Sequence, residues 1–336
     1  MRHFIFSLII ACTIALSFGP IAPASAQTDS PTPPTAYGVR WTGDSIGVNT
    51  NDGLWLFSAS NLDLTPQHYL AGQNIPHMRF DPTGHYAALV VSSLNGQIVN
   101  VLDLTTGETL LEITPPMGAE LGVGALAFDA TGERLVVSSG HRIEMFNLTT
   151  LESEFTFSHP TAEWIMGVQF GTLYDTLIIA EESTLTIYRI EDLALSTEAE
   201  PILEYALPAE IKAFQVLAGS PVAFLIADDT LYELLLSSGD LLPLTESVAA
   251  ITTFTVTTDG SSIIYSTFGL WAVFDITSQT LSAEYPLNDS SLYFRMFATD
   301  STTVVGLQSD GKVLLWNIMN PAVVTELGSF APYVIG

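Results

Sequence analysis

Short runs of alternating apolar and polar residues, separated by turn residues, fill the chain from Tyr37 onward. The runs are rich in β-branched and aromatic residues, and almost none of this region repeats its apolar residues with the period of a helix. Alternation with a period of two is typical of strands that bury one face. The pattern therefore predicts an all-β chain.

Two apolar markers recur along this region, and they recur in step. An apolar-x-apolar triplet opens each unit, at residues 39–41, 78–80, 126–128, 168–170, 214–216, 254–256 and 294–296. An apolar run that ends in a bulky residue follows in each unit, at residues 54–57, 99–102, 143–146, 185–188, 231–234, 271–274 and 313–316. The triplets are 39, 48, 42, 46, 40 and 40 residues apart, which makes seven units.

Tight turns divide every unit into strands. A turn such as Asp52-Gly53 or Asn95-Gly96 stands between the two markers, and a further turn such as Thr105-Thr106-Gly107 follows the second one. Three turns make four strands, and four antiparallel strands in a repeat of about 42 residues describe a propeller blade rather than a solenoid rung. The sequence predicts a seven-bladed β-propeller of four-stranded antiparallel blades.

Two nearly identical segments, FDPTG at residues 80–84 and FDATG at 128–132, stand between the first and second strands of their units. Proline presets the backbone for a turn, and glycine supplies the left-handed residue that closes it. A catalytic pair of aspartates would not recur once per blade. We therefore interpret Asp81 and Asp129 as turn residues.

These turns, together with strand ends such as Trp316-Asn317 and Phe274-Asp275, resemble those of WD-repeat β-propellers. The resemblance covers most of residues 37–328, although the Gly-His pair that normally begins such a repeat is missing at the expected places. The family builds a buried hydrogen-bonded tetrad from His, Asp, Ser or Thr, and Trp. The resemblance implies a rigid disc that scaffolds interactions, usually without catalysis.

The segments outside the repeats predict an exported protein. Residues 1–26 combine Arg2, an apolar run and a small-residue cleavage site, as in a secretory signal peptide, and residues 27–36 form a Pro/Thr-rich linker. Residues 37–328 form the propeller. We expect an extracytoplasmic location, secreted or periplasmic; a lipid anchor at Cys12, within a lipobox-like segment, is the less favoured alternative.

The chain begins with a first strand and ends with a fourth strand, so no exchanged strand locks the ring. The apolar tail, residues 329–336, could pair with an open edge near the N-terminus and close it.

The amino-acid composition limits the classes of partner that the protein can bind. The net charge is −27 with only nine basic residues, which disfavours nucleic acid because phosphates would be repelled. Cleavage would remove the single cysteine, and the mature chain would contain no membrane span. We expect an unidentified protein or peptide partner.

Arginine side chains gather at the predicted channel. The middle residue of the triplet is arginine in units seven, one and two, which are neighbours in a closed ring: Arg295, Arg40 and Arg79. Guanidinium groups bind carboxylate or phosphate through two hydrogen bonds, and His77 lies nearby, so these four residues form a candidate anion site. Alternatively, each arginine pairs with a carboxylate between blades.

The longest connections between units share one face with the turns between second and third strands. This face is acidic and loop-rich, and its candidate partner-binding residues are Glu120, His159, Trp164, Glu181, Glu182, Asp228 and Asp229. It could equally be an ordinary solvated surface.

No motif for a metal, a cofactor or a catalytic residue is recognisable. The histidines lack ligand spacing, and the chain has neither a nucleophile elbow nor a nucleotide loop. The favoured function is a non-catalytic binding scaffold. The alternative is a hydrolase or lyase that holds an anionic small molecule with the channel arginines and uses His77 as general acid or base.

Overall fold

The computed structural model describes residues 33–118, 122–160, 164–171, 175–196, 199–217, 220–244, 250–287, 289, 292–300 and 302–331. For residues 295–298 and 321–323 it describes the backbone. These residues belong to one compact unit, Pro33–Gly336.

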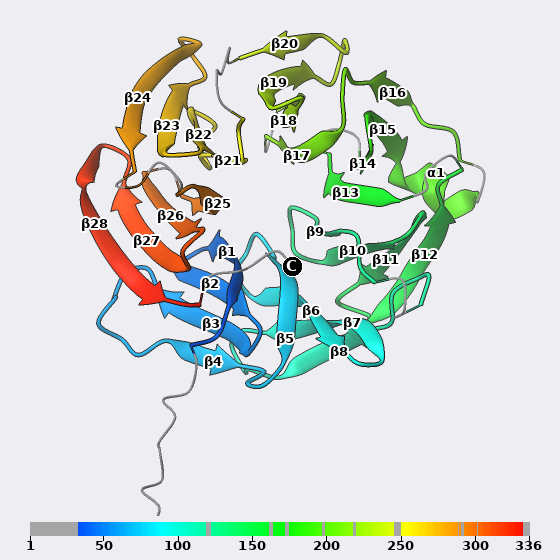
Figure 1. Ribbon diagram of the computed structural model, residues 1–336. Coiled ribbons are helices and arrows are strands. Elements are labelled where there is room, and N and C mark those ends of the chain that lie inside the picture. Colours follow the sequence, from blue (N-terminus) through cyan, green and yellow to red (C-terminus); the bar gives the residue numbers. More distant parts are fainter. Residues whose placement is uncertain are drawn as a thin grey trace, which may run out of the picture. The chain divides into compact units, whose positions relative to one another are not determined.

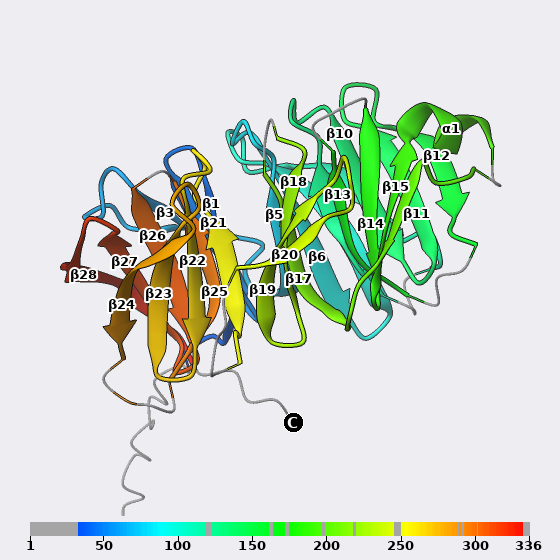
Figure 2. The same cartoon turned by 90° about the horizontal axis from the view of Figure 1, so that it is seen from above.

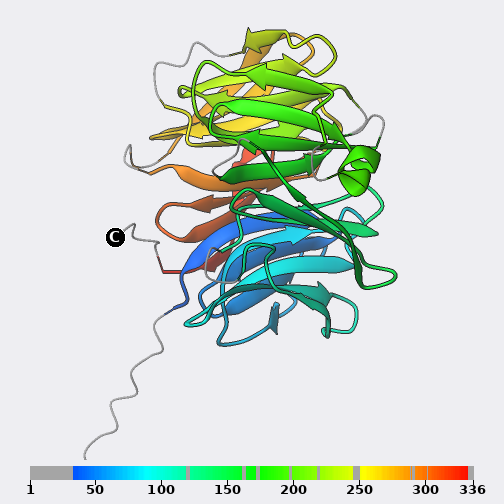
Figure 3. The same ribbon diagram turned by 90° about the vertical axis from the view of Figure 1, so that its right-hand side faces the viewer.

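Seven four-stranded antiparallel sheets stand around a central axis, so the fold is the predicted seven-bladed β-propeller (Figure 1). Within each blade the strands are neighbours in chain order, from an innermost first strand to an outermost fourth strand. Seen from the side, the strands run between the two faces of the disc (Figures 2 and 3).

The innermost strands are β1 (Ala36–Thr42), β5 (Asn74–Phe80), β9 (Leu126–Phe128), β13 (Ile165–Phe170), β17 (Ile211–Val216), β21 (Thr253–Val256) and β25 (Phe294–Thr299). The second strands are β2 (Ser45–Thr50), β6 (Tyr86–Ser93), β10 (Arg134–Ser139), β14 (Thr176–Glu181), β18 (Val222–Ala227), β22 (Ser262–Thr267) and β26 (Thr303–Gln308).

The third strands are β3 (Gly53–Ser58), β7 (Gly96–Asp103), β11 (Arg142–Asn147), β15 (Thr184–Arg189), β19 (Thr230–Leu235), β23 (Leu270–Asp275) and β27 (Lys312–Asn317). The outermost strands are β4 (Gln67–Tyr69), β8 (Thr109–Ile113), β12 (Glu152–Ser158), β16 (Leu203–Ala206), β20 (Leu241–Pro243), β24 (Thr280–Pro286) and β28 (Asn320–Ser329).

Both sequence markers fall on the expected strands. Every apolar-x-apolar triplet lies in an innermost strand, and every run with a bulky end lies in a third strand. A short helix, α1 (Ile190–Leu195), follows β15 at the outer edge of its blade and contacts β12 of the preceding one. No helix within the described ranges is long and apolar enough to cross a membrane.

The hydrophobic core lies between the blades. Seven clusters of buried side chains each join two adjacent blades; one of them packs Phe157 of β12 against Tyr188 of β15. A single blade is a four-stranded sheet that cannot bury both of its apolar faces, so each blade depends on its neighbours.

The ring closes by packing, because the first blade (β1–β4) and the last (β25–β28) are each formed by a continuous segment. β1 contacts β25, and one core cluster spans these two blades. Phe330 is buried in that cluster. The Ala331 N–H donates to the carbonyl of Pro34 at 2.9 Å, and Ala331 forms a parallel bridge with Thr35.

The recurring aspartates organise turns, as the sequence indicated. The buried Asp81 carboxylate accepts hydrogen bonds from the N–H groups of Thr83 at 3.0 Å and Tyr86 at 2.6 Å. Asp129 accepts from the hydroxyl of Thr131 at 2.8 Å. Gly84 closes the first of these turns with φ +78°, a left-handed conformation that favours glycine.

Candidate functional site: the central channel

The middle residues of the innermost triplets line the central channel. Two cavities, of about 330 Å³ and 550 Å³, are both lined by Arg40 and Arg79. The smaller cavity is lined by residues at or just before the starts of β9, β13 and β17, and the larger one by residues at or near the ends of the innermost strands. Because antiparallel strands alternate in direction, the smaller cavity opens toward the face that carries the turns between second and third strands. We call this the hairpin face.

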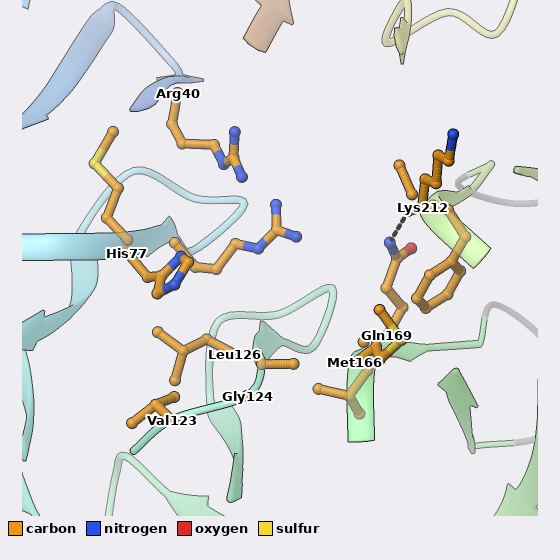
Figure 4. A pocket seen from close by; sticks show the side chains of 15 residues that line it. Arg40, His77, Val123, Gly124, Leu126, Met166, Gln169 and Lys212 are labelled. Atoms are coloured by element: carbon orange, nitrogen blue, oxygen red, sulfur yellow. Dashed lines mark hydrogen bonds between the residues drawn. The ribbon is translucent and has the colours of Figure 1, made fainter. Parts of the chain in front are cut away.

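The smaller cavity has cationic and apolar sides. Figure 4 shows Arg40 and His77 on one side, with Met166 across from them and Leu126 between. Lys212, at the start of β17, also lines the cavity, and its ammonium group forms an ion pair with Asp229. The described residues that line the two cavities include no aspartate or glutamate.

Burial and neighbouring positive charges lower the pKa values of the basic side chains in this cavity. Burial, together with the charge of Arg79, holds the pKa of Arg40 well below its ordinary value. Burial also lowers the pKa of Arg79. The pKa of His77 is lowered by burial and then by the charges of both arginines, so its imidazole resists protonation.

These shifts indicate an environment that disfavours positive charge. The Nη1 of Arg40 donates a hydrogen bond to the carbonyl of Val39 at 3.0 Å. Among the described residues, no carboxylate forms an ion pair with Arg79. A bound anion would offset the mutual repulsion of the two guanidinium groups and hydrogen-bond to them.

Two glutamines at the middle position of their own triplets form hydrogen bonds to the neighbouring blade. Gln169 donates to the carbonyl of Phe214 at 2.9 Å and accepts from the N–H of Val216 at 2.8 Å, which joins its blade to the next one. Gln215 accepts from Val256 N–H at 3.1 Å and joins the following pair. These amide groups form a fixed wall of the channel.

The structure thus brings together three of the four candidate anion-binding residues. Arg40, Arg79 and His77 line one cavity. Arg295 lies in β25, the innermost strand that contacts β1, but its side chain is outside the described residues. Sequence reasoning missed Lys212, which precedes its triplet, and it missed the apolar side chains of Leu126 and Met166 in the same cavity.

The candidate partner-binding residues separate into exposed and buried groups. Trp164 is 42% exposed, and Glu182, Asp228 and Asp229 are exposed or half-exposed on the hairpin face. Glu120 lies outside the described residues.

His159, by contrast, is only 4% exposed and contacts Glu181 within the protein. The His159 Nδ1 lies 2.8 Å from a carboxylate oxygen of Glu181, and its Nε2 lies 2.8 Å from the hydroxyl of Tyr188. The hydroxyl of Thr186 is 3.3 Å from the same Nε2. Burial, followed by the charge of Glu181, raises the pKa of Tyr188. The sequence had not pointed to Thr186 or Tyr188.

Comparison with models of known protein families finds no match, and comparison with curated protein sequences finds none either. Function is therefore inferred from the chain's own geometry.

Proposed function

We propose that the protein is an exported, non-catalytic β-propeller that binds a small anionic ligand in its central channel. The observation that carries this proposal is the cationic side of the smaller cavity. Arg40, Arg79 and His77 line that side, and the described lining residues include no aspartate or glutamate. In a protein of net charge −27, this gathering of cationic side chains in one cavity supports an anion-binding role. Export is supported by the signal-like sequence of residues 1–26.

The resemblance to WD-repeat propellers belongs to the same proposal. The buried group formed by His159, Glu181, Thr186 and Tyr188 supports it, since the family's tetrad combines a histidine, an acid, a hydroxyl and an aromatic residue. In this group glutamate and tyrosine would stand for the family's aspartate and tryptophan. A binding scaffold of this kind can also present the exposed residues of the hairpin face to a protein or peptide partner.

A hydrolase or lyase is the second candidate, favoured by His77. Its lowered pKa keeps the imidazole neutral at neutral pH, as a general base requires. In that case the two arginines would hold the substrate, and His77→Gln would abolish turnover while leaving substrate binding nearly intact. For a binding protein, His77→Gln changes only affinity.

Thermal unfolding of the purified protein in sodium hexanoate, sodium phosphate and sodium chloride at equal ionic strength tests anion binding. We expect at least one of the first two salts to raise Tm above its value in chloride, since a ligand that binds only the folded state stabilises it. Equal ionic strength is needed because a highly charged surface responds to salt alone.

Arg79→Met is expected to weaken anion binding about 10- to 100-fold, because a hydrogen bond to a charged group contributes about 1.5–3 kcal/mol. Arg142→Met is the matched control: Arg142 is an exposed residue of β11 that lines neither cavity. Titration calorimetry measures the anion affinity of each variant. Equal Tm values in all three salts, or equal affinities in the two variants, would contradict the proposal.

The affinity for the anion is expected to rise as the pH falls below about 6.5, the ordinary pKa of histidine. Without an anion, the lowered pKa of His77 makes the unfolded state bind more protons, so this group makes the fold less stable as pH falls through that value. A bound anion reverses the unfavourable field and favours protonated His77. His77→Gln should flatten the dependence and His85→Gln, an exposed control, should keep it; the same slope in both would refute this role.

A further inference from the structure

The larger cavity, of about 550 Å³, has an aromatic side that the smaller one lacks. Four half-buried aromatic side chains line it, each the last residue of its triplet: Trp41, Phe80, Phe128 and Phe170. They come from β1, β5, β9 and β13, which contact one another in that order around the ring. We call these four residues the aromatic arc.

Contacts within the protein hold two of these rings in place. The indole N–H of Trp41 donates to the carbonyl of Gly43 at 2.9 Å, so its polar group is already bonded. The Phe80 ring lies against Gly47 of the first blade, where an added Cβ atom would collide with the ring. Rings that are already fixed lose little conformational entropy when a ligand packs against them. The arc therefore offers a preformed apolar surface.

Threonine side chains of the sixth and seventh blades line the same cavity. Thr253 and Thr255 lie in β21, and Thr299 lies in β25. The Thr299 hydroxyl donates to the carbonyl of Thr303 at 2.8 Å. The hydroxyl groups of Thr253 and Thr255 have no hydrogen-bond partner within the described ranges. Thr255 is only 8% exposed, so its hydroxyl depends on the contents of the cavity for a partner.

The other polar side chains of this lining include two glutamines and two arginines. Gln169 and Gln215 form hydrogen bonds to neighbouring blades. Arg40 and Arg79 line both cavities, and a ligand held between the arc and the threonines needs no contact from either of them. The described lining contains no aspartate or glutamate that would select a cationic ligand.

A ligand that matches this lining has an apolar face and several hydroxyl groups around its edge. A purely apolar ring would pack on the arc but leave the Thr255 hydroxyl without a partner, which is unfavourable. An open-chain polyol has hydroxyl groups but no rigid apolar face, and it loses more conformational entropy on binding. A pyranose ring has C–H groups on its face and hydroxyl groups at its rim. The cavity has roughly eighteen times the volume of one water in the liquid, enough for one or two such rings.

We propose that the larger cavity binds an uncharged saccharide of one or two pyranose rings. A sugar ring packs its C–H face on the aromatic arc, and its hydroxyl groups bond to Thr253 and Thr255. Pro82, Leu217 and Thr258 lie in the turns between first and second strands, so this cavity reaches the face opposite the hairpin face. The saccharide site goes beyond the proposed anion site and does not depend on it.

Titration calorimetry of the purified protein with methyl β-D-glucoside, cellobiose, maltose, lactose and chitobiose tests the site. At least one of these saccharides is expected to bind with a Kd of roughly 0.1–10 mM, as suits a small neutral ligand. Sorbitol has the hydroxyl groups without the ring, and benzyl alcohol has a ring with a single hydroxyl. Each should bind at least about tenfold more weakly than the best saccharide.

Two variants test the two sides of the cavity. Phe170→Leu removes a ring but keeps an apolar side chain, and it should weaken saccharide binding about 3- to 10-fold. Phe268→Leu is its control, since Phe268 is 55% exposed and lines neither cavity. Thr255→Val removes the hydroxyl at nearly constant volume and should weaken binding about 2- to 10-fold. Thr109→Val, at an exposed position of β8, is the control.

Trp41 supplies a spectroscopic signal from the site itself. Of the tryptophans that the structure describes, Trp41 alone lines either cavity, so bound saccharide is expected to change the tryptophan emission. Trp41→Phe should abolish this change while keeping the calorimetric affinity within about threefold, because an aromatic ring remains.

The outcomes separate the saccharide site from the anion site. No binding of any of the five saccharides, or tighter binding of benzyl alcohol than of all of them, would overturn the saccharide site and leave the anion site standing. Saccharide binding that is unaltered in both Phe170→Leu and Thr255→Val would place the sugar elsewhere and overturn it as well. Saccharide binding without any anion binding would overturn the proposed function alone.

Discussion

Replacing His159 with alanine is expected to lower the free energy of unfolding by about 3–5 kcal/mol, because it leaves the largely buried carboxylate of Glu181 without the imidazole nitrogen that lies 2.8 Å from it. The Tyr188 hydroxyl lies 2.8 Å from Nε2 of His159, so the same change removes a partner from a second buried polar group. For a domain of about 300 residues, this loss corresponds to a fall in Tm of about 5–8 °C. Denaturant unfolding and calorimetry of the purified protein measure both quantities.

A double variant distinguishes a lost contact from general damage. His159→Leu combined with Glu181→Leu removes both polar partners, so it should destabilise less than either single change. His85→Ala, at an exposed turn, should change stability by no more than about 0.5 kcal/mol. An unaltered unfolding midpoint in His159→Ala would show that the buried contact does not stabilise the fold.

Phe330→Ala is expected to cost about 3–5 kcal/mol, the usual range for truncating a buried phenylalanine. Phe330 is 8% exposed, packs edge-on against Trp55 of β3 with ring centroids 6.5 Å apart, and lies in the cluster that joins the last blade to the first. Its N–H also donates to the carbonyl of Gly311 at 3.0 Å. Deleting residues 330–336 should cost at least as much, since it also removes the hydrogen bond from Ala331 to Pro34.

We expect these losses of stability because none of the described strands is exchanged between the first and the last blade. Within the part of the chain that the structure describes, blades one and seven meet through side-chain packing and these few backbone contacts, so we expect faster unfolding in both variants. Met319→Ala, an exposed change in the same blade, is the control. A truncated protein that melts at the temperature of the intact one would exclude a closing role for the tail.

The sequence predicted only part of the channel site. Arg40 and Arg79 occupy the same position of consecutive triplets, so the repeat alone placed them side by side at the channel. The repeat also places Gln169 at that position, yet its amide bonds to the next blade, 45 residues along the chain, instead of facing a ligand. Alternation along a strand gives the direction of a side chain, whereas its partners come from a different blade.

The same limit explains why the sequence suggested that His159 is exposed. Its position in a long connection suggested an accessible surface residue, but the connection leads into the next blade, and the imidazole bonds to Tyr188, 29 residues later. The apolar side chains of the smaller cavity were missed for a similar reason. Met166 and Leu126 are ordinary strand residues in the sequence, and only the curvature of the ring places them in the same cavity as Arg40.

The amino-acid sequence by itself determined the number of blades, the four strands in each and the turns that connect them, because these depend on local alternation and on residues that tolerate left-handed backbone. It also determined the acidic net charge and the position of Arg40 and Arg79 along their innermost strands. The tertiary structure decided which cations share a cavity, which polar groups are buried and how the ring closes, because those outcomes depend on packing between blades.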